Sequence, residues 1–370
     1  MNKILFTGVP GFIGTRLARK LLEVKDRRLV CLVEPRPAML EKARAFAAEF
    51  SGATNGGDAR VELVTADISK PRFGLDGDTF DRLRAECSEV WHLAALYNLA
   101  APKRLSYDVN VEGTRHVLGF CEGVTGFRKL VYFSTIVVSG DRPGTILERE
   151  LECGQRFRNW YEETKYLAEV EVRRRADAVP SVVIRPAVVI GDSRSGEIDK
   201  YDGPYYVISA LARLEREKKL GLVGRMMGAG HAPALFHLIP VDYLLGATLA
   251  IAAAPGSIGK AFHVIDPGEL TVSDARTLIL DRFGVPEFPL RLSASVVRAL
   301  MRVPGLEKLA GVPRQIFDYM DLENRYDFAN TQAVTAAAGV QCPQLPRYLD
   351  TLVAYVRSHP EIKLSRAPAS

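Results

Sequence analysis

The chain has 370 residues, of which 47% are hydrophobic and 25% are charged. These proportions are those of a globular protein and exclude a disordered or fibrous chain. At about 100–200 residues per domain, the length allows one large domain or two closely joined ones. The 49 basic and 44 acidic residues give a net charge of +5, and the two signs are interspersed. No basic stripe of the kind that binds nucleic acid is therefore present.

The cysteines and the apolar segments narrow the class of protein further. The five cysteines are scattered and form no Cys-x-x-Cys pair. They predict neither a metal site nor a disulfide framework, and a reducing cytoplasm is the simplest compartment. The N-terminus enters a glycine turn instead of a signal-peptide cleavage site. The most apolar later window, 235–254, contains His237 and Asp242, so we expect a buried strand and helix there and no membrane span.

The first predicted element is a short apolar strand, Lys3–Thr7, which runs directly into a turn with glycines at intervals of three. Gly8 permits a tight turn, Gly11 lets backbone amides approach a pyrophosphate, and Gly14 lets the following helix pack closely on the sheet. The N-terminal amides of that helix would face the anion. The sequence therefore predicts a dinucleotide-binding turn made by Thr7, Gly8, Gly11, Phe12, Ile13 and Gly14.

Strand-like and helix-like segments alternate from there to about residue 191. After the helix at 12–24, strands are predicted at 28–33, 60–65, 90–93, 129–133 and 181–185, and helices at 39–50, 108–121 and 161–176. This alternation predicts βαβ units and a doubly wound, mostly parallel sheet covered by helices, an α/β fold of Rossmann type. Such a sheet binds its ligand outside the carboxyl ends of its strands.

The pattern changes beyond residue 191. A polar segment precedes one more strand at 235–239, a helix at 241–254 and a final strand at 261–265, and the last hundred residues are predicted to form helices separated by prolines. We therefore predict a dinucleotide-binding domain of residues 1–191 plus about 235–265. Residues 192–234 and 266–370 would form a smaller, mainly helical substrate domain.

The end of the second strand carries two opposed signals about the cofactor. Glu34 lies twenty residues after Gly14, where a carboxylate accepts hydrogen bonds from ribose hydroxyls and favours NAD. Arg36 could instead pair with the 2′-phosphate of NADP. The sequence therefore leaves the choice between NAD and NADP open.

The ends of the third and fourth strands supply further candidate cofactor contacts. Asp67 could meet the adenine amino group, with Ile68 against the ring. The small residues Ala94 and Ala95 would let the pyrophosphate and ribose lie against the backbone. His92, just before them, is expected to be a packed residue and not a catalytic one.

Tyr161 and Lys165 lie four residues apart in an amphipathic segment, so one helical turn brings them onto the same face. A nearby ammonium favours the phenolate, so we expect it to lower the pKa of the tyrosine. Such a pair suits protonation of a carbonyl oxygen while hydride arrives at its carbon, and the lysine could also bond the nicotinamide ribose. The fifth strand ends at Ser134 and Thr135, which places a hydroxyl at the ligand crevice.

Motifs over the first two thirds of the chain resemble the extended short-chain dehydrogenase/reductase family. They are TGVPGFIG (7–14), HLAA (92–95), NVEGT (110–114), FST (133–135), YEETK (161–165), RPAVVIGD (185–192) and IPVDY (239–243). The resemblance implies that Tyr161 is the catalytic acid/base and Lys165 its partner. It also implies that Thr135, or the adjacent Ser134, is the hydroxyl member of the site.

Two longer segments, 159–169 and 184–206, resemble the thioester-reductase and fatty-acyl-CoA-reductase branch, the male sterility type. That branch reduces acyl thioesters on coenzyme A or a carrier protein to aldehydes or alcohols. The family resemblance further implies that Asn110 organises the fold and that Pro186 lines the nicotinamide pocket. Relatives in the branch often carry Arg where this chain has Glu34, and the C-terminal third matches no substrate domain.

The sequence thus predicts a cytoplasmic NAD(P)-dependent reductase that transfers hydride to an acyl thioester or a fatty-aldehyde-like carbonyl, with no metal. Three alternatives stay open: a 3β-hydroxysteroid- or dihydroflavonol-type ketone/alcohol oxidoreductase, a nucleotide-sugar epimerase, and a non-catalytic NAD(P)-sensing regulator. The apolar segment 291–320 argues against a sugar nucleotide. A regulator need not retain the reactive tyrosine.

The predicted partners follow from two surface segments. The basic segment 213–225 fits an acidic partner such as acyl-CoA or an acyl carrier protein, or is a solvated helix face. The amphipathic stretch 296–320 could cover a lipid chain or contact a membrane peripherally, or belongs to the core. Relatives often dimerise through helices beside the catalytic one, so a homodimer is also considered.

Overall fold

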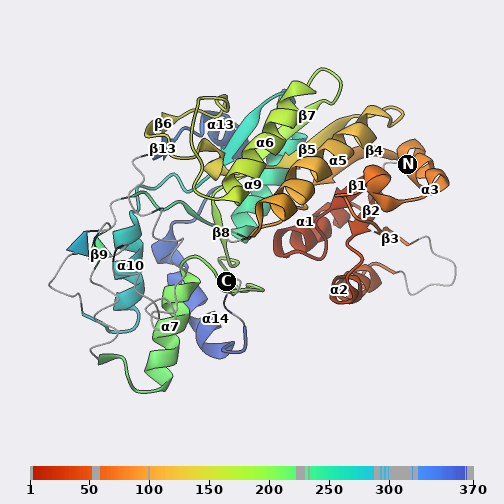
Figure 1. The fold of residues 1–370 in the computed structure, drawn as a ribbon. Helices are drawn as coiled ribbons and strands as arrows, with labels where there is room; N and C mark the ends of the chain where they lie inside the picture. Colours follow the sequence, from red (N-terminus) through yellow and green to blue (C-terminus); the bar gives the residue numbers. More distant parts are fainter. Residues whose placement is uncertain are drawn as a thin grey trace.

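The computed structural model describes residues 3–51, 59–98, 101–221, 230–231, 234–286, 292–293, 296, 299, 319, 324–362 and 364. Seven strands form a parallel sheet in the order β11-β7-β5-β4-β1-β2-β3 (Figure 1). They are β1 (Lys3–Thr7), β2 (Arg28–Val33), β3 (Val61–Thr65), β4 (Cys87–His92), β5 (Lys129–Phe133), β7 (Ser181–Pro186) and β11 (Ala261–Val264). The strand order reverses between β1 and β4, which confirms the predicted doubly wound α/β fold.

Helices cover both faces of the sheet because successive strand residues point to opposite sides. In β1, Ile4 and Phe6 pack in the core beneath α1 (Phe12–Leu22), α2 (Pro37–Ala48) and α9 (Val241–Ala253). Leu5 packs in a second core with α3 (Gly77–Glu86), α5 (Gly113–Glu122) and α6 (Trp160–Arg174). Both faces of the sheet are thus buried, which is why the sequences of the strands are continuous apolar runs.

Several short elements were not predicted from the sequence. They are α4 (Lys103–Tyr107), the π-helical turn η2 (Asp108–Glu112), the 3₁₀ turns η1 (Pro71–Gly74), η3 (Ile136–Ser139) and η5 (Leu345–Arg347), and the short strands β6 (Gly144–Ile146), paired with β13 (Asn324–Tyr326), β9 (Gly230–His231), paired with β12 (Leu292–Ser293), and β8 (Val188–Ile190). The partner of β8 is β10 (Leu238–Pro240), which overlaps the strand predicted at 235–239. The predicted helix at 108–121 is therefore a π turn followed by α5. Elements of two to five residues carry too little periodicity to be recognised in a sequence.

A third apolar core lies outside the sheet. It is formed mainly by α7 (Tyr205–Arg216), α10 (Val272–Asp281) and α14 (Leu349–Ser358), which Figure 1 shows grouped to one side of the sheet. In contrast, α13 (Ala329–Ala337) packs against α9 and β11. Part of the predicted substrate domain therefore lies against the sheet, and the predicted domain boundaries stay a prediction.

The parts of the chain that the structure describes contain no helix with the length and apolar character needed to cross a bilayer. The apolar window at 235–254 forms β10 and the buried helix α9. Within the same described residues, no three His, Cys, Asp or Glu side chains are grouped to hold a metal ion. Most of the amphipathic stretch 296–320, and residues 222–225 of the basic segment, lie outside the described residues.

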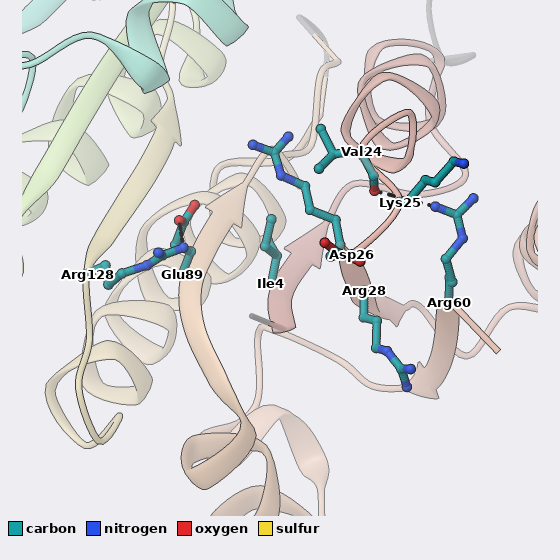
Figure 2. A pocket seen from close by; sticks show the side chains of 9 residues that line it. Ile4, Val24, Lys25, Asp26, Arg28, Arg60, Glu89 and Arg128 are labelled. Atoms are coloured by element: carbon teal, nitrogen blue, oxygen red, sulfur yellow. Dashed lines mark hydrogen bonds and ion pairs between the residues drawn. The ribbon is translucent and has the colours of Figure 1, made fainter. Parts of the chain in front are cut away.

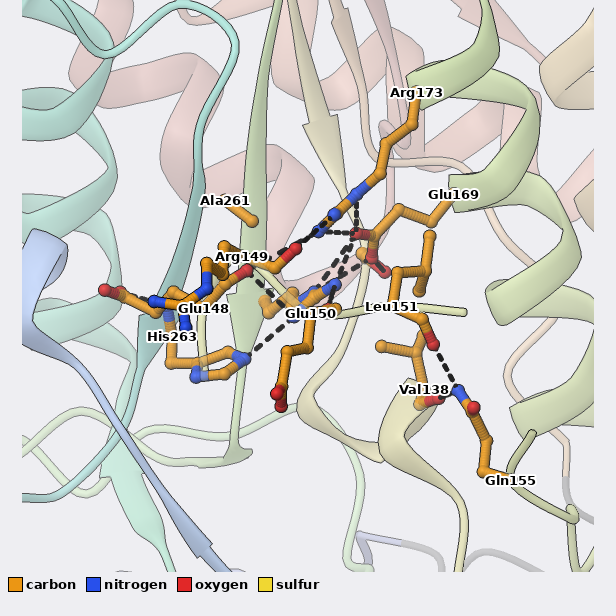
Figure 3. A network of polar contacts seen from close by, with 12 residues as sticks. Val138, Glu148, Arg149, Glu150, Leu151, Gln155, Glu169, Arg173, Ala261 and His263 are labelled. Atoms are coloured by element: carbon orange, nitrogen blue, oxygen red, sulfur yellow. Dashed lines mark hydrogen bonds and ion pairs between the residues drawn. The ribbon is translucent and has the colours of Figure 1, made fainter. Parts of the chain in front are cut away.

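A buried ion network joins helix α6 to strand β7 (Figure 3). The Glu169 carboxylate, fully buried, accepts hydrogen bonds from Arg185 Nη2 at 2.6 Å and Arg173 Nε at 3.1 Å. The guanidinium of Arg185 also donates to the backbone oxygens of Glu148 and Glu150 at 3.3 and 2.8 Å. Burial alone would raise the pKa of Glu169, but the charge of Arg185, above all, outweighs it and lowers that pKa to about 2. The pair therefore stays charged in the core and fixes α6 on the sheet.

We expect Glu169→Gln to reduce the free energy of unfolding by about 3–5 kcal/mol, because it leaves the Arg185 guanidinium buried without its anion. Urea denaturation measures this, with the partly exposed Glu163→Gln on the same helix as the control. A depressed folded-state pKa contributes stability that is present above the unfolded value of about 4.3 and is lost as the pH falls toward 2. The loss of stability over that interval should therefore be smaller in Glu169→Gln than in the wild type. Equal stabilities of the two variants would contradict this account.

Candidate active site

The glycine turn after β1 is closed on itself too tightly to admit side chains. Gly8 has φ +110°, and a Cβ there would lie 2.9 Å from the Leu93 Cβ. The Gly11 amide donates to the Gly8 carbonyl at 2.8 Å, and a Cβ on Gly14 would lie only 2.2 Å from that same oxygen. The turn thus forms a cradle at the N-terminus of α1 that any Cβ would fill, which is the geometry a pyrophosphate needs.

Thr7, predicted as a cofactor contact, has its side chain fully buried. Its Oγ1 accepts hydrogen bonds from the amides of Leu93 and Ala94, both at 3.1 Å. The residue therefore fixes the segment after β4 against the glycine turn, so that Leu93 and Ala94 lie beside the cradle. We infer that Thr7 shapes the cofactor site through these two amides and leaves its hydroxyl in the core.

The two opposed cofactor signals, Glu34 and Arg36, form one exposed ion pair, with Arg36 Nη2 2.5 Å from Glu34 Oε2. Both side chains lie just beyond β2, so either could meet the adenosine ribose, and the choice between NAD and NADP stays open. Asp67, beyond β3, accepts hydrogen bonds from the amide and hydroxyl of Ser69 at 3.0 and 2.6 Å. Its carboxylate therefore caps its own turn, while Ile68 packs against α5 at Gly113.

The predicted reactive groups meet where β5 ends and α6 begins. Asn159 caps α6 by accepting a hydrogen bond from the Glu162 amide at 3.0 Å, which places Tyr161 in the first turn. The Tyr161 hydroxyl faces the side chain of Thr135. The Lys165 ammonium, one turn later and buried, donates to the Phe133 carbonyl at 2.6 Å and to the Tyr132 hydroxyl at 3.0 Å.

Ser134 and Thr135 point to opposite sides of the strand end. The Ser134 hydroxyl donates to the buried Glu169 carboxylate at 2.6 Å. Thr135 starts η3, where its Oγ1 accepts from the Val137 amide at 3.4 Å, and faces Tyr161. The geometry therefore favours Thr135 over Ser134 as the hydroxyl member of the site.

The protonation of the pair follows from its burial. Burial raises the pKa of Tyr161 to about 12, and the side chain of Thr135 opposes that rise only in part. Burial also lowers the pKa of Lys165 to about 7, against the charge of Glu169. The expectation that the pKa of Tyr161 is lowered is wrong, because desolvation of the phenolate dominates. The phenol is protonated at neutral pH, as a proton donor must be.

Two further residues frame the crevice. Asn110, within the π-helical turn η2, accepts from the Leu96 amide at 2.7 Å and donates to Thr164 Oγ1 at 2.9 Å. It thereby joins the segment after β4 to α6, as expected of a residue that organises the fold. Pro186 is the buried last residue of β7, opposite Val264 of β11. Its predicted place in the nicotinamide pocket stays a prediction.

Tyr97 and Tyr132 contact the reactive pair but were not predicted from the sequence. The Tyr97 ring, 53% exposed, lies edge-on to the Tyr161 ring with centroids 5.0 Å apart. Tyr132 is fully buried beneath Lys165. A tyrosine in an apolar strand is normally predicted to be a core residue. The only feature of the sequence that could have indicated a role for Tyr132 in the site is its position just before the hydroxyls at the strand end.

A hollow of about 670 Å³ lies at the opposite, amino-terminal edge of the sheet (Figure 2). It is lined by Ile4 of β1 and mainly by basic side chains, and its Glu89 carboxylate is paired with Arg128. Doubly wound sheets bind their ligands at the carboxyl ends of the strands. This hollow is therefore separate from the site at Tyr161.

The chain is similar to known proteins over most of its length. A family model described as "Male sterility protein", of NAD-binding type, matches residues 6–248. The non-canonical nonribosomal peptide synthetase FrzA of Cladobotryum sp is 26% identical over 388 residues, which cover 95% of this chain and 36% of that protein. The chain thus spans about a third of the length of this relative.

Two solved structures share the fold. The terminal R domain from the myxalamid PKS-NRPS biosynthetic pathway superposes with a TM-score of 0.80 at 24% identity, over 100% of this chain and 93% of that chain. A thiolation-reductase di-domain from an archaeal non-ribosomal peptide synthetase superposes with a TM-score of 0.73 at 19% identity, over 98% of this chain and 76% of that chain.

We expect Gly14→Ala to weaken the binding of NADH or NADPH at least about tenfold, because the new methyl group would displace the Gly8 carbonyl and open the cradle. Fluorescence titration of the reduced cofactors measures this. The matched control is Gly119→Ala in α5, where a Cβ would meet no atom within 4 Å. That variant should bind the cofactors normally and gain about 0.5–1 kcal/mol of stability. Unchanged binding by Gly14→Ala would exclude the turn as the cofactor site.

Proposed function

Because this chain belongs to the NAD-binding male sterility protein family, within the extended short-chain dehydrogenases/reductases, we propose that it is an NAD(P)-dependent reductase of acyl thioesters. The observation that carries the proposal is the placement of Tyr161 opposite Thr135, beside the buried Lys165, at the carboxyl end of β5. This is the edge of the sheet at which the glycine cradle also lies. A protonated phenol there can donate to a carbonyl oxygen.

In the proposed reaction the bound reduced nicotinamide supplies hydride to the carbonyl carbon. Tyr161 Oη gives its proton to the carbonyl oxygen, and Thr135 Oγ1 holds that oxygen by a hydrogen bond. The Lys165 ammonium stabilises the negative charge that develops on the phenol oxygen. The tetrahedral product then expels the thiolate, which takes up a proton, so that one acyl thioester yields one aldehyde and one thiol.

The proposed substrate is a thioester on coenzyme A or on an acidic carrier protein. One similar structure contains a thiolation domain next to its reductase domain, which supports a carrier-bound substrate. The C-terminal end of α7 and the residues after it expose Arg213, Arg216 and Lys218. These cations would attract the phosphates or carboxylates of such a partner. The cytoplasmic location, the peripheral membrane contact and the homodimer stay predictions.

We expect Tyr161→Phe to lower kcat by about 10²–10⁴-fold, because it removes the proton donor and keeps the ring. NADH and NADPH consumption should be followed with a long-chain acyl-CoA, a fatty aldehyde, a steroid ketone and a UDP-sugar. Tyr166→Phe, on the same helix and with its ring tilted against that of Phe157, is the control. Cofactor binding should survive in both variants. Unchanged turnover in Tyr161→Phe would contradict the proposal, and binding without turnover of any substrate would favour a sensor.

The two adjacent hydroxyls should differ in what their loss affects. Thr135→Val should lower kcat at least about tenfold with little change in stability, because its hydroxyl contacts Tyr161. Ser134→Ala should lower the free energy of unfolding by about 1.5–3 kcal/mol, because it removes a hydrogen bond to the charged Glu169. Steady-state kinetics and urea denaturation of both variants separate the two effects. The reverse result would assign catalysis to Ser134.

A further inference from the structure

Lys165 contacts the phenol of Tyr132, which takes no part in the proposed reaction. Tyr132 lies in β5 with its side chain fully buried, and its hydroxyl oxygen is 3.0 Å from Lys165 Nζ. The ammonium also lies 4.6 Å from the centre of the Tyr132 ring. An ammonium has three N–H donors and no acceptor. Tyr132 therefore accepts a hydrogen bond from Lys165, and its own proton must be donated elsewhere.

The Tyr132 hydroxyl faces the side chain of Thr114 on α5, which we take as the acceptor of its proton. Thr114 Oγ1 donates its own proton to the Asn110 carbonyl at 2.6 Å. Its oxygen is thereby left as an acceptor for Tyr132 and for His92 Nε2, which lies 3.2 Å away. The donors and acceptors around Thr114 thus fix the direction of each hydrogen bond.

The same reasoning extends this series of hydrogen bonds to the glycine turn. Thr7 Oγ1 accepts from two backbone amides, so its proton is donated to His92 Nδ1 at 2.7 Å. His92 therefore carries its proton on Nε2 and is neutral. Burial, aided by the charge of Lys165, lowers the pKa of His92 to about 3, which agrees with a neutral ring. A hydrogen-bond chain thus links Thr7, His92, Thr114, Tyr132 and Lys165, and its two arms, one from Thr7 through His92 and one from Lys165 through Tyr132, both donate toward Thr114.

We propose that Tyr132 is a positioning residue for Lys165: with the Tyr132 proton given to Thr114, a lone pair of the phenol oxygen accepts from the lysine and holds it in its charged form, with its remaining N–H free for the crevice. The Phe133 carbonyl, at 2.6 Å, uses a second donor of the ammonium, so one donor remains. Because the chain begins at the residue that precedes the glycine turn, one buried network sets both the cradle and the lysine. The role in catalysis rests on the proposed reductase function.

Tyr132→Phe tests the proposal with a readout that needs no turnover. Loss of the acceptor destabilises the ammonium, so the pKa of Lys165 should fall below its wild-type value. NMR titration of protein labelled with ¹³Cε-lysine measures that pKa directly, with Lys165→Met assigning the signal. In kinetics, kcat should fall about tenfold, whereas KM for substrate and cofactor should change less than about twofold. The rate depends on the ammonium and falls as the pH rises through its pKa, so this limb of the kcat profile should move to lower pH.

Tyr201→Phe is the matched control. It also removes a buried phenol hydroxyl, one that donates to the His359 carbonyl at 2.9 Å in the C-terminal core. Its lysine titration and its kcat profile should equal those of the wild type. Thr114→Val, which removes the acceptor of the Tyr132 proton, should move the pKa of Lys165 in the same direction as Tyr132→Phe and serves where that variant folds poorly.

An unchanged lysine titration and kcat profile in Tyr132→Phe would overturn the proposal. So would an activity loss that merely follows a lower melting temperature or weaker cofactor binding. If Tyr161→Phe abolishes turnover while Tyr132→Phe is silent, only the role of Tyr132 fails. If Tyr161→Phe retains turnover, the proposed function fails, while a shifted lysine titration would still support the contact between Tyr132 and Lys165.

Discussion

Four successive residues at the end of β5 each face helix α6, and the geometry of the site depends on this attachment. Tyr132 and the Phe133 carbonyl accept hydrogen bonds from Lys165, Ser134 donates one to Glu169, and Thr135 faces Tyr161. A strand directs alternate side chains to opposite faces. The strand end can therefore hold the helix from the core side and from the crevice side at once, which leaves Tyr161 and Thr135 little freedom to separate.

The Lys165 ammonium is buried beneath this attachment, and its hydrogen bonds and a nearby carboxylate keep it in place. Removing an ammonium from water costs several kcal/mol unless hydrogen bonds replace its hydration. Lys165 obtains two such bonds from β5, and Glu169, one helical turn further on, adds a favourable charge. Glu169 also accepts a hydrogen bond from Arg185 at 2.6 Å. The balance leaves the pKa of Lys165 lowered to about 7, so that small changes in its hydrogen bonds alter its charge near neutral pH.

The sequence predicts the frame of the molecule better than the directions of its side chains. The strands Lys3–Thr7, Arg28–Val33 and Lys129–Phe133 were predicted with their observed bounds, because each is an apolar run that ends at a turn residue or a hydroxyl. The glycine turn was equally predictable from the sequence, because only glycine fits its close contacts. The family resemblance was predicted from the same local motifs, and the family match confirms it.

The sequence could not predict the properties that depend on how side chains pack in the folded protein. That Ser134 and Thr135 point apart follows from strand geometry, but which of them faces the crevice depends on how α6 packs. Thr7 was predicted as a cofactor contact from its place in the motif, whereas its hydroxyl lies in the core and binds two amides. The pKa of Tyr161 was predicted to fall because proximity to a lysine was considered without desolvation, which in the folded chain is the larger effect.

The C-terminal part of the chain also contributes to the first turn of α6. The Tyr319 hydroxyl donates to the buried Glu162 carboxylate at 2.5 Å and accepts from Asn159 Nδ2 at 2.8 Å. Asn159 is the residue that caps α6, and Glu162 directly follows Tyr161. The turn that carries the reactive phenol is therefore bonded to β5 on one side and to Tyr319 on the other. Because both attachments act on the same helical turn, the position of Tyr161 depends on the C-terminal part being in place as well as on the sheet.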